Sequence, residues 1–595
     1  MFAVARRFAA GLLIAQLLAS CGGEEATEKG GSVYRHAIDG TPRTLDPVAA
    51  ATTYSSLVVV NIFDTLYRYK YLARPYELAP NLAAGFPRVS DDGLTYTFRI
   101  RPDARFADDP AFPDKRGRRV TVHDLIYSLK RHFDPAQRSR GAFLWSGRIQ
   151  GLDAWGENGA DYDQPVAGLE AVDDHTLRIR LTEPYPLLLH TLTTGFSAVV
   201  PREAVEHYGR EFGVRPVGSG PFRLSSFDST MARLTRNPAF RRPPLDLSAE
   251  GFDPDDHAGL GLDRLDGRRY PFVHRLEIHF IEESAARWSA FAGGAVDNTI
   301  VPNQQLDSLL ATRDPVTFRP EIGERYHGHA ALELGFVYTG FDMSDRRYGH
   351  HPHPERAEAN RALRCAMRAA FDWQERNETF YAGIGRVFPG VIPPALPSFD
   401  PGRSRDSVTT DLERGRRLLA EHGWTADRLP ELTYGYVGSV AQRQVYAQFR
   451  DRMLALGFPP DKIVAEVFPT FGEFSRAIDE RRLDVFFLSW LLDYPDAQNT
   501  LQLFYGPNAT PGSNNFNYDN PAFNALYEQA ISMQPGPERD RLYRRMNDHV
   551  IDDCVAISGL SRKRIHLWKD HIAMLPDSEI LAGFFLRFVD VEPDR

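Results

Sequence analysis

The sequence predicts a mixed α/β fold, because runs with the two-residue period of strands are interspersed with runs that have the helical period. Residues 94–101 (LTYTFRIR) and 175–182 (HTLRIRLT) alternate in polarity and are rich in β-prone side chains, so both predict strands. Residues 275–281 (RLEIHFI) and 483–490 (LDVFFLSW) are apolar, β-prone runs that predict buried strands.

Two segments predict amphipathic helices. Residues 121–134 (TVHDLIYSLKRHFD) place apolar side chains at helical spacing behind Thr121, a residue type that caps helix N-termini. Residues 409–424 (TTDLERGRRLLAEHGW) repeat this pattern and reach Gly423, which suits the C′ position after a helix. Because both element types occur throughout the chain, we expect α/β or α+β layers.

The size and charge of the chain limit the number of domains it can form and the kinds of partner it can bind. With 595 residues, it can form two or three domains that each have a core. The net charge is −9 at pH 7 with both signs interspersed, which argues against nucleic acid as a partner. After the N-terminal run, no apolar segment is long enough to cross a membrane.

The N-terminus has the order of a secretory signal. Arg6 and Arg7 precede an apolar run, residues 8–19, that is shorter than the roughly 20 residues a transmembrane helix needs. Residues 18–21 (LASC) resemble a bacterial lipobox, in which the cysteine is lipidated and becomes the mature N-terminus. We therefore expect a signal peptide over 1–20, a lipid anchor at Cys21 and a flexible tether over 21–30. The alternative is an ordinary secretory signal with an incidental cysteine.

The chain carries none of the catalytic motifs that we sought. It has no G-x-S-x-G, H-E-x-x-H, G-x-x-x-x-G-K or C-x-x-C pattern. We therefore predict a protein that is not an enzyme and that has no cofactor.

Histidines gather at His350, His351 and His353, with His327 and His329 upstream. Such clusters can bind metal, but the two neighbouring prolines and the polar setting favour an exposed loop. We predict no metal site.

Residues 243–269 form an acidic segment without an apolar period. Its carboxylates are Asp246, Glu250, Asp253, Asp255, Asp256, Asp263 and Asp266. We expect an acidic surface loop. A calcium site is the weaker alternative, because the spacing from Asp253 lacks the glycine and the closing glutamate of an EF-hand loop.

Two cysteines remain after the proposed anchor, Cys365 and Cys554. They could form one disulfide in an oxidising compartment or stay as two buried thiols. The sequence leaves both possibilities open, because the separation of the two Cα atoms decides between them.

Five blocks of sequence, in order, resemble the bacterial extracellular solute-binding proteins of family 5, which serve peptide, dipeptide and nickel ABC importers. The blocks are residues 45–69, residues 78–109 with 120–135, residues 216–228 with 236–240, residues 360–376 with 388–401, and residues 484–506. The resemblance extends from about residue 33 to 570, and the acidic segment 243–269 is longer than the connection usual in that family.

The resemblance implies the periplasmic-binding-protein type II fold: two α/β lobes with a hinge, plus an extra domain on the first lobe. We place the first lobe at 31–76, 197–334 and 553–595, the extra domain at 77–196, and the second lobe at 335–552. The hinge crossings would then lie near 335 and 552, and residues 332–341 (LELGFVYTGF) suit a hinge strand.

The same resemblance implies which residues contact a ligand. One segment is Thr52, Thr53 and Tyr54, and the other is Ser489, Trp490 and Leu491, whose backbone would run along a peptide. Asp493 matches an aspartate that pairs with the α-ammonium group of the ligand, although an aspartate here could instead cap the following turn. Phe143 and Trp145 would line the entrance or belong to the core.

One departure from the family pattern concerns the ligand carboxylate. Some oligopeptide binders carry an arginine shortly before the tryptophan, where this chain has Phe487. Arg476, Arg481 and Arg482 are candidate substitutes, but their spacing does not identify one of them.

The sequence therefore predicts a substrate-binding lipoprotein of an ABC importer that captures peptides or peptide-like solutes between its lobes. We expect a monomer in the periplasm or cell envelope, with an inner-membrane permease as partner and membrane contact only through the lipid anchor. Alternatives are a binding protein for an oligosaccharide, opine or metal chelate, a sensor or chaperone on the same fold, or a secreted enzyme.

Overall fold

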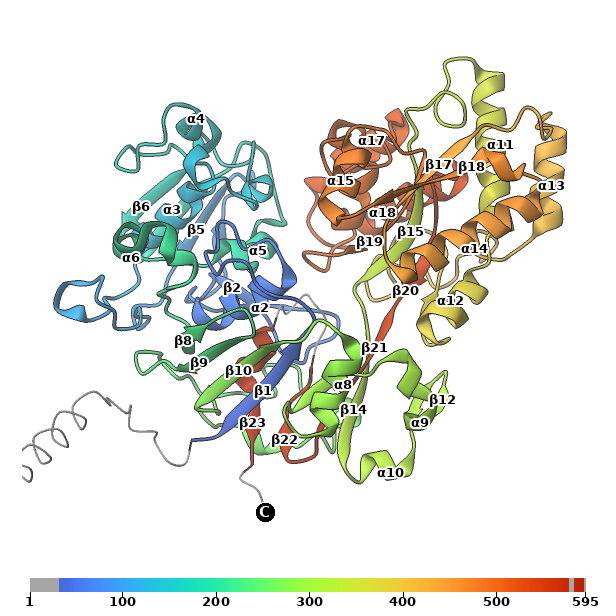
Figure 1. Ribbon diagram of the computed structural model, residues 1–595. Coiled ribbons are helices and arrows are strands. Elements are labelled where there is room, and N and C mark those ends of the chain that lie inside the picture. The colour runs from blue at the N-terminus through green and yellow to red at the C-terminus, as the bar shows by residue number, and fades with distance from the viewer. Residues whose placement is uncertain (1–30, 577–582, 593–595) are drawn as a thin grey trace, which may run out of the picture.

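A computed structural model describes residues 31–576 and 583–592, which form two lobes that are linked by extended strands (Figure 1). The signal peptide, Cys21 and the tether that the sequence predicts lie outside the described residues. Within the described part of the chain, no helix has the length and apolar character needed to span a bilayer.

The first lobe is built on a four-stranded sheet of order β1-β10-β9-β8. Its strands are β1 (Val33–Ile38), β8 (Phe222–Phe227), β9 (Met231–Arg236) and β10 (Arg275–Phe280). Strand β1 runs parallel to β10, and the other neighbours are antiparallel. Helices α2 (Thr53–Ile62) and α8 (Ser284–Ala292) belong to this lobe, as do the pairs β2–β3 (Tyr67–Tyr69, Leu78–Pro80), β12–β13 (Leu310–Arg313, Val316–Phe318) and β22–β23 (Ile572–Ala573, Asp590–Val591).

A second antiparallel sheet extends this lobe, with the order β4-β5-β7-β6. Its strands are β4 (Arg88–Val89), β5 (Thr95–Arg99), β6 (Leu169–Asp173) and β7 (Thr176–Arg180). The helices around it are α3 (Val122–Arg131), α4 (Leu152–Glu157), α5 (Leu188–Thr191) and α6 (Arg202–Tyr208).

The second lobe is built on a six-stranded sheet of order β16-β20-β15-β19-β17-β18. Its strands are β15 (Gly335–Phe341), β16 (Arg386–Val387), β17 (Leu432–Val437), β18 (Ile463–Phe468), β19 (Val485–Leu491) and β20 (Ala556–Ser561). The accompanying helices are α11 (Pro354–Ala370), α12 (Trp373–Tyr381), α13 (Leu412–Glu421), α14 (Val440–Leu456), α15 (Phe471–Asp479), α16 (Gln498–Leu501), α17 (Pro521–Ile531) and α18 (Pro537–Asp552).

The predicted elements are present. Strands β5, β7 and β10 lie within the runs that predicted them, and β19 overlaps its run and extends one residue beyond it, to Leu491. Helices α3 and α13 lie within the two segments that predicted helices. Thr121 is the N-cap of α3, and its backbone N–H donates to the Asp124 carboxylate at 2.8 Å. Gly423 has a φ of +70°, as expected for the residue that follows a helix C-cap.

The chain passes between the lobes twice, at neighbouring positions. Strand β14 (Tyr326–Leu332) pairs with β21 (Lys563–Lys569) in a three-stranded sheet whose third strand is β11 (Asn298–Ile300), whereas β15 and β20 pair in the second lobe. The first crossing is therefore at Glu333 and Leu334 and the second at Arg562 (Figure 1). The crossing expected near residue 552 is corrected, because β20 pairs with β15 and so still belongs to the second lobe.

Glu333 joins the two crossings. Its backbone N–H donates to the Arg562 carbonyl at 2.8 Å, and its carboxylate accepts from Nε of Arg562 and Nε of Arg564, each at 2.5 Å. The Glu333 side chain is only 3% exposed, so the two guanidinium groups supply the partners that a buried carboxylate requires.

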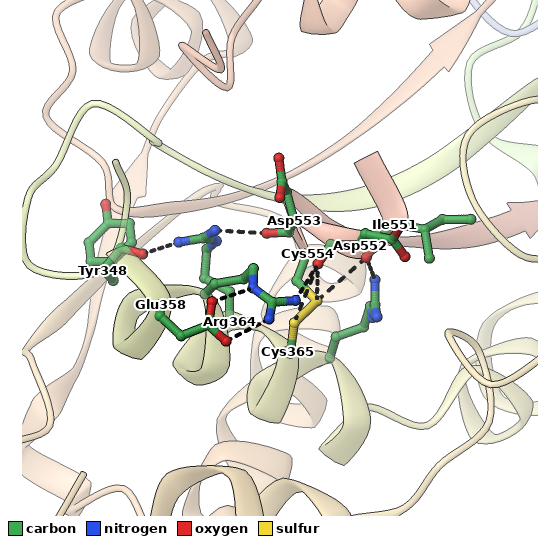
Figure 2. The surroundings of a disulfide bond; sticks show 10 residues. Tyr348, Glu358, Arg364, Cys365, Ile551, Asp552, Asp553 and Cys554 are labelled. Atoms are coloured by element: carbon green, nitrogen blue, oxygen red, sulfur yellow. Dashed lines mark hydrogen bonds and ion pairs between the residues drawn. A yellow bond between two sulfur atoms is a disulfide. The ribbon is translucent and has the colours of Figure 1, made fainter. Parts of the chain in front are cut away.

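A disulfide between Cys365 and Cys554 links α11 to the segment that follows α18, with Cα atoms 5.2 Å apart (Figure 2). The structure thus decides what the sequence left open. Around the disulfide, Arg361 and Arg364 of α11 donate to the Asp552 and Asp553 carbonyls at 3.2 and 2.7 Å, and Arg368 donates to the Ile551 carbonyl. These cations satisfy carbonyls that the end of α18 leaves without helical partners.

Replacing both cysteines by alanine should lower the free energy of unfolding by about 2–5 kcal/mol, because the bond closes a long loop in the unfolded chain. The sequence separation of 189 residues sets the size of that loop. Urea unfolding of the parent and the double variant measures the difference, and the parent in reductant is the control. An unchanged midpoint in both comparisons would show that the cross-link contributes no stability.

Candidate functional site

Two adjoining cavities lie where the lobes meet. The larger, here called the hinge cavity, has a volume of about 340 Å³. It is lined by residues of β1, α2, α8, β11, β14, β21 and both crossings. The smaller, here called the Asp493 cavity, has a volume of about 140 Å³. It is lined by residues of α2, β2, the end of β19 and connecting segments of the β4-β5-β7-β6 sheet. Thr53 and Leu491 line both cavities, so the two cavities adjoin, and together they are called the groove below.

The first predicted segment lies at the start of α2 and lines this groove. Thr52 is the helix N-cap, and its Oγ1 accepts from the Ser55 backbone N–H at 3.1 Å. Thr52 and Thr53 line the Asp493 cavity, whereas Thr53 and Tyr54 line the hinge cavity. The cap fixes this end of the helix, and with it the position of the three side chains.

The second predicted segment belongs to β19, which is a central strand with one partly open edge. On one side, β15 pairs with β19 along its whole length. On the other side, β17 pairs only with Val485 and Phe486. Among the described residues, no strand pairs with β19 beyond Phe486 on that side.

The main-chain groups of Ser489 and Leu491 face the open edge. Bonds from Leu492 N to Leu334 O and from Asp342 N to Asp484 O mark the even-numbered positions as those that face β15. Because hydrogen-bonding directions alternate along an antiparallel strand, the odd-numbered positions face the other way. The edge from Phe487 to Leu491 can therefore pair with an extended ligand.

Asp493 follows β19 and is held by Asn499. The Asn499 Nδ2 group donates to Asp493 Oδ2 at 3.0 Å, and the Asp493 backbone N–H donates to Asn499 Oδ1 at 3.1 Å. The side chain is open to solvent within the cleft, while the protein around it raises the pKa of the carboxyl by reducing its hydration. Among the described residues, no arginine, lysine or histidine forms an ion pair with Asp493.

Trp490 is half-buried, and the same asparagine orients it. Its indole Nε1–H donates to Asn499 Oδ1 at 3.0 Å. Asn499 itself is fully buried, so one buried side chain bonds to both Trp490 and Asp493. No pattern in the sequence singled out Asn499, because it lies six residues beyond Asp493 on a short helix.

The two aromatic residues from the extra domain have different environments. Phe143 is 56% exposed and lines the Asp493 cavity. Trp145 is fully buried and donates from its indole nitrogen to Thr191 Oγ1 at 3.0 Å. The expectation that Trp145 lines the entrance is therefore corrected, since its ring is part of the core and makes its polar contact there.

A third cavity, of about 170 Å³, lies beside the open edge of β19. Ser489 lines it together with Phe471, Phe474, Phe487 and Arg562. Arg562 also borders the hinge cavity, so this aromatic-walled space adjoins the same groove.

The cationic residues of the groove were not found from the sequence. Arg287, Arg562 and Arg564 line the hinge cavity, and Arg68 lines the Asp493 cavity. None of the three arginines that the sequence suggested lines these cavities; Arg482, for example, pairs with Glu466. The residues that do line them are scattered over the chain, so their spacing gave no signal.

Part of the acidic segment 243–269 supports the groove. Glu250 is buried and forms a bidentate pair with Arg68, and its Oε2 also accepts from the Tyr71 backbone N–H at 2.8 Å. Leu245, Leu247, Leu262 and Leu265 are buried as well. The expectation of a surface loop is corrected for these residues, because the segment packs against the first lobe. No group of three metal-binding side chains occurs among the described residues.

Two histidines of the hinge cavity are kept uncharged by burial. Burial lowers the pKa of His36 to about 4 and that of His566 to about 3. At neutral pH they therefore contribute no charge to the cavity.

The five histidines that the sequence suggested as a possible metal cluster belong to two different segments. His327 and His329 lie on β14, whereas His350, His351 and His353 precede α11.

Two α/β lobes that are joined by paired crossings and enclose a polar groove define a solute-binding protein of the periplasmic type II class. Residues 77–512 match the family of bacterial extracellular solute-binding proteins, family 5, over its middle region. This match covers more than half of the chain, so the chain belongs to that family.

Individual relatives are distant but cover most of the chain. The glutathione-binding protein GsiB of Shigella flexneri serotype 5b is 23% identical over 92% of this chain and 92% of its own length. The heme-binding protein A of Haemophilus influenzae is 21% identical over 79% of this chain and 76% of its own length. The periplasmic binding protein DppA of Helicobacter pylori, solved with the peptide STSA, has a TM-score of 0.71 at 19% identity and covers 95% of this chain and 98% of its own. This similarity shows the shared fold.

The buried histidines predict that the protein loses stability in mild acid. Their folded-state pKa lies below the unfolded value of about 6.5, so only the unfolded chain takes up their protons as the pH falls through 6.5. For His566→Gln, we expect the loss of stability between pH 7 and pH 5 to shrink by about 2 kcal/mol.

Urea unfolding at both pH values measures this difference, and His207→Gln, at an exposed position, is the matched control. Equal losses in the parent and in His566→Gln would show that His566 does not resist protonation in the folded state.

Proposed function

We propose that this protein captures peptides or peptide-like solutes between its lobes and delivers them to the membrane permease of an ABC importer. Membership of the solute-binding family supports the binding role. Two of its relatives, GsiB and the solved DppA complex, are described as binding glutathione and the peptide STSA. A peptide ligand for this chain agrees with both descriptions.

The observation that carries the proposal is the environment of Asp493. This carboxylate lines an interlobe cavity, is held in place by Asn499, and forms no ion pair with the described residues. A charged group in such a position is stabilised when a ligand supplies the opposite charge, and an α-ammonium group does so through a charge-assisted hydrogen bond.

The open edge of β19 adds affinity that does not depend on ligand side chains. An extended peptide could pair with the main chain of Ser489 and Leu491, as an added strand does. Its side chains would then enter the hinge cavity or the aromatic-walled cavity. A ligand that spans both lobes favours their closure, because it contacts both only when they are close.

We also propose that Cys21 anchors the protein to a membrane on the periplasmic or outer side. The lipobox-like residues 18–21 support this role. The other proposed contact with a membrane is docking to the permease.

Asp493→Asn should weaken the binding of tripeptides with a free amino terminus by about 10- to 100-fold, because it removes a charged partner worth about 1.5–3 kcal/mol. N-acetylated peptides should bind the parent and the variant equally. Calorimetry measures both series, and Asp451→Asn, at an exposed position on α14, is the matched control. If the variant retains the preference of the parent for free peptides, Asp493 does not bind the ammonium group.

The anchor can be tested separately in cells that express the full chain. Cys21→Ser should abolish incorporation of labelled palmitate and should move the protein from the membrane fraction to the soluble envelope fraction. Cys365→Ser, at the disulfide, is the matched control for the loss of a cysteine. Labelling that persists in Cys21→Ser would contradict the assignment.

A further inference from the structure

The two lobes also touch at a place outside the groove. The first lobe has a second apolar cluster, formed by α8, α9 (Leu306–Leu309), β12, β21 and the loops on either side of β11. Ile384 of the second lobe is only 3% exposed and belongs to this same cluster, and Ala382 packs against it. These two residues, together with Phe380 and with residues 301–313 of the first lobe, form what is here called the rear contact.

Two hydrogen bonds between the lobes reinforce the rear contact. Asn303 Nδ2 donates to the Phe380 carbonyl at 2.9 Å, and Arg313 Nη1 donates to the Ala382 carbonyl at 2.7 Å. Arg313 also forms an ion pair with Asp307 of α9, which holds its guanidinium group on the first lobe. The rear contact therefore combines buried apolar surface with directed polar bonds, one of them from a cation.

The second-lobe side of the rear contact is a turn that is held within its own lobe. Asn377 of α12 is buried, and its side-chain amide exchanges two hydrogen bonds of 2.9 Å with the backbone of Gly385. The Asn377 carbonyl also accepts from the Gly383 backbone N–H at 2.9 Å. The turn that carries Ala382 and Ile384 thus moves with α12 when the second lobe moves.

The apolar cluster lies on the opposite face of the β11-β21-β14 sheet from the hinge cavity. Side chains of a strand point alternately to its two faces. On β21, Arg564 and His566 line the hinge cavity, whereas Ile565 and Leu567 belong to the apolar cluster. The cluster that receives Ile384 therefore covers the face that points away from the cavity.

The order of the second-lobe sheet also separates the rear contact from the groove. Strands β20 and β15, which continue into the crossings, lie between β16 and β19. Leu491 of β19 pairs with Gly335, beside the first crossing, and Arg386 of β16 pairs with Ser561, beside the second. A rotation about the crossings that brings the end of β19 closer to the first lobe therefore carries the turn before β16 away from it. Figure 1 shows α12 next to α9 and β12, on the far side of the crossings from the extra sheet.

We propose that the rear contact is a latch that opposes closure of the lobes, so that residues outside the groove help to set the affinity for a ligand. Closure would separate Ile384 from the apolar cluster and would draw the Phe380 and Ala382 carbonyls away from their donors. Part of the binding free energy of a ligand would then be used to break these contacts. The inference goes beyond the proposed function, because the latch acts on the arrangement of the lobes whichever solute is bound.

The experiment measures the arrangement of the lobes in the full chain without a ligand. Fluorophores are attached through azido side chains that replace Glu157 of α4 and Gln529 of α17, two exposed positions on different lobes. Energy transfer between the fluorophores reports their separation, and closure of the lobes shortens it. The azido chemistry leaves the Cys365–Cys554 disulfide intact.

The double variant Asn303→Ala/Arg313→Ala removes both hydrogen bonds between the lobes. The population with the shorter separation should rise about 3- to 30-fold over that of the parent, since two bonds that hold the lobes apart are lost. Each single variant should give part of this change, so the test does not depend on the double variant alone. Arg319→Ala is the matched control, because Arg319 is exposed in the same segment and donates to the Asp307 carbonyl within the first lobe.

Calorimetry with Ala-Ala-Ala tests the effect on affinity, and this part of the experiment rests on the proposed peptide function. The double variant should bind trialanine more tightly than the parent, by the same factor as the rise in the closed population. If the populations shift as expected but trialanine binds neither protein, the latch stands and peptide capture fails for this probe.

Three outcomes would overturn the inference. If the separation of the fluorophores is the same in the parent, the single variants and the double variant, the rear contact does not hold the lobes. If the variants favour a longer separation, the rear contact promotes closure instead of opposing it. If the populations shift but trialanine binds parent and double variant equally, the latch does not set the affinity.

Discussion

The arrangement of the two lobes depends on one buried carboxylate. Glu333 lies at the first crossing, bonds through its backbone to the second, and accepts hydrogen bonds from two guanidinium groups. Removing one member of such a buried set costs about 3–5 kcal/mol, because a charge is then left without its partner. The two crossings are therefore held in register by an interaction that also places arginine side chains in the groove between the lobes.

Around the Asp493 cavity, too, buried polar groups hold in place the side chains that line the cavity. Asn499 orients Trp490 and Asp493. Glu250, from the acidic segment 243–269, neutralises and positions Arg68. A binding site that must receive a flexible polar ligand benefits from such fixed partners, since less conformational freedom is lost when the ligand binds. The acidic segment thus contributes to the site through its few buried residues.

The groups that line the site can bind a ligand without any catalytic motif. The exposed edge of β19 offers main-chain hydrogen bonds, and the cavities beside it are walled by aromatic, aliphatic and arginine side chains. In the binding mode proposed above, main-chain pairing would give affinity that is independent of the ligand's sequence. The disulfide, and the three arginines of α11 that donate to carbonyls at the end of α18, lie within the second lobe. They stabilise the lobe that contains β19.

Much of the fold followed from local pattern, whereas most of the site did not. Period and capping predicted β5, β7, β10, β19, α3 and α13, because these signals depend on residues a few positions apart. The ordered blocks identified the family and pointed to Thr53, Leu491 and Asp493, which lie together in the groove. The sequence did not indicate that Glu333 and Arg562 bond to each other at the crossings, or that Asn499 holds Asp493. It also did not decide whether Trp145 lies in the core or at the entrance. Glu333 and Arg562 are 229 residues apart, and only the tertiary structure determines that such distant side chains become neighbours. Asn499 lies six residues after Asp493, but no periodic pattern indicates that its side chain turns back to Asp493 and Trp490.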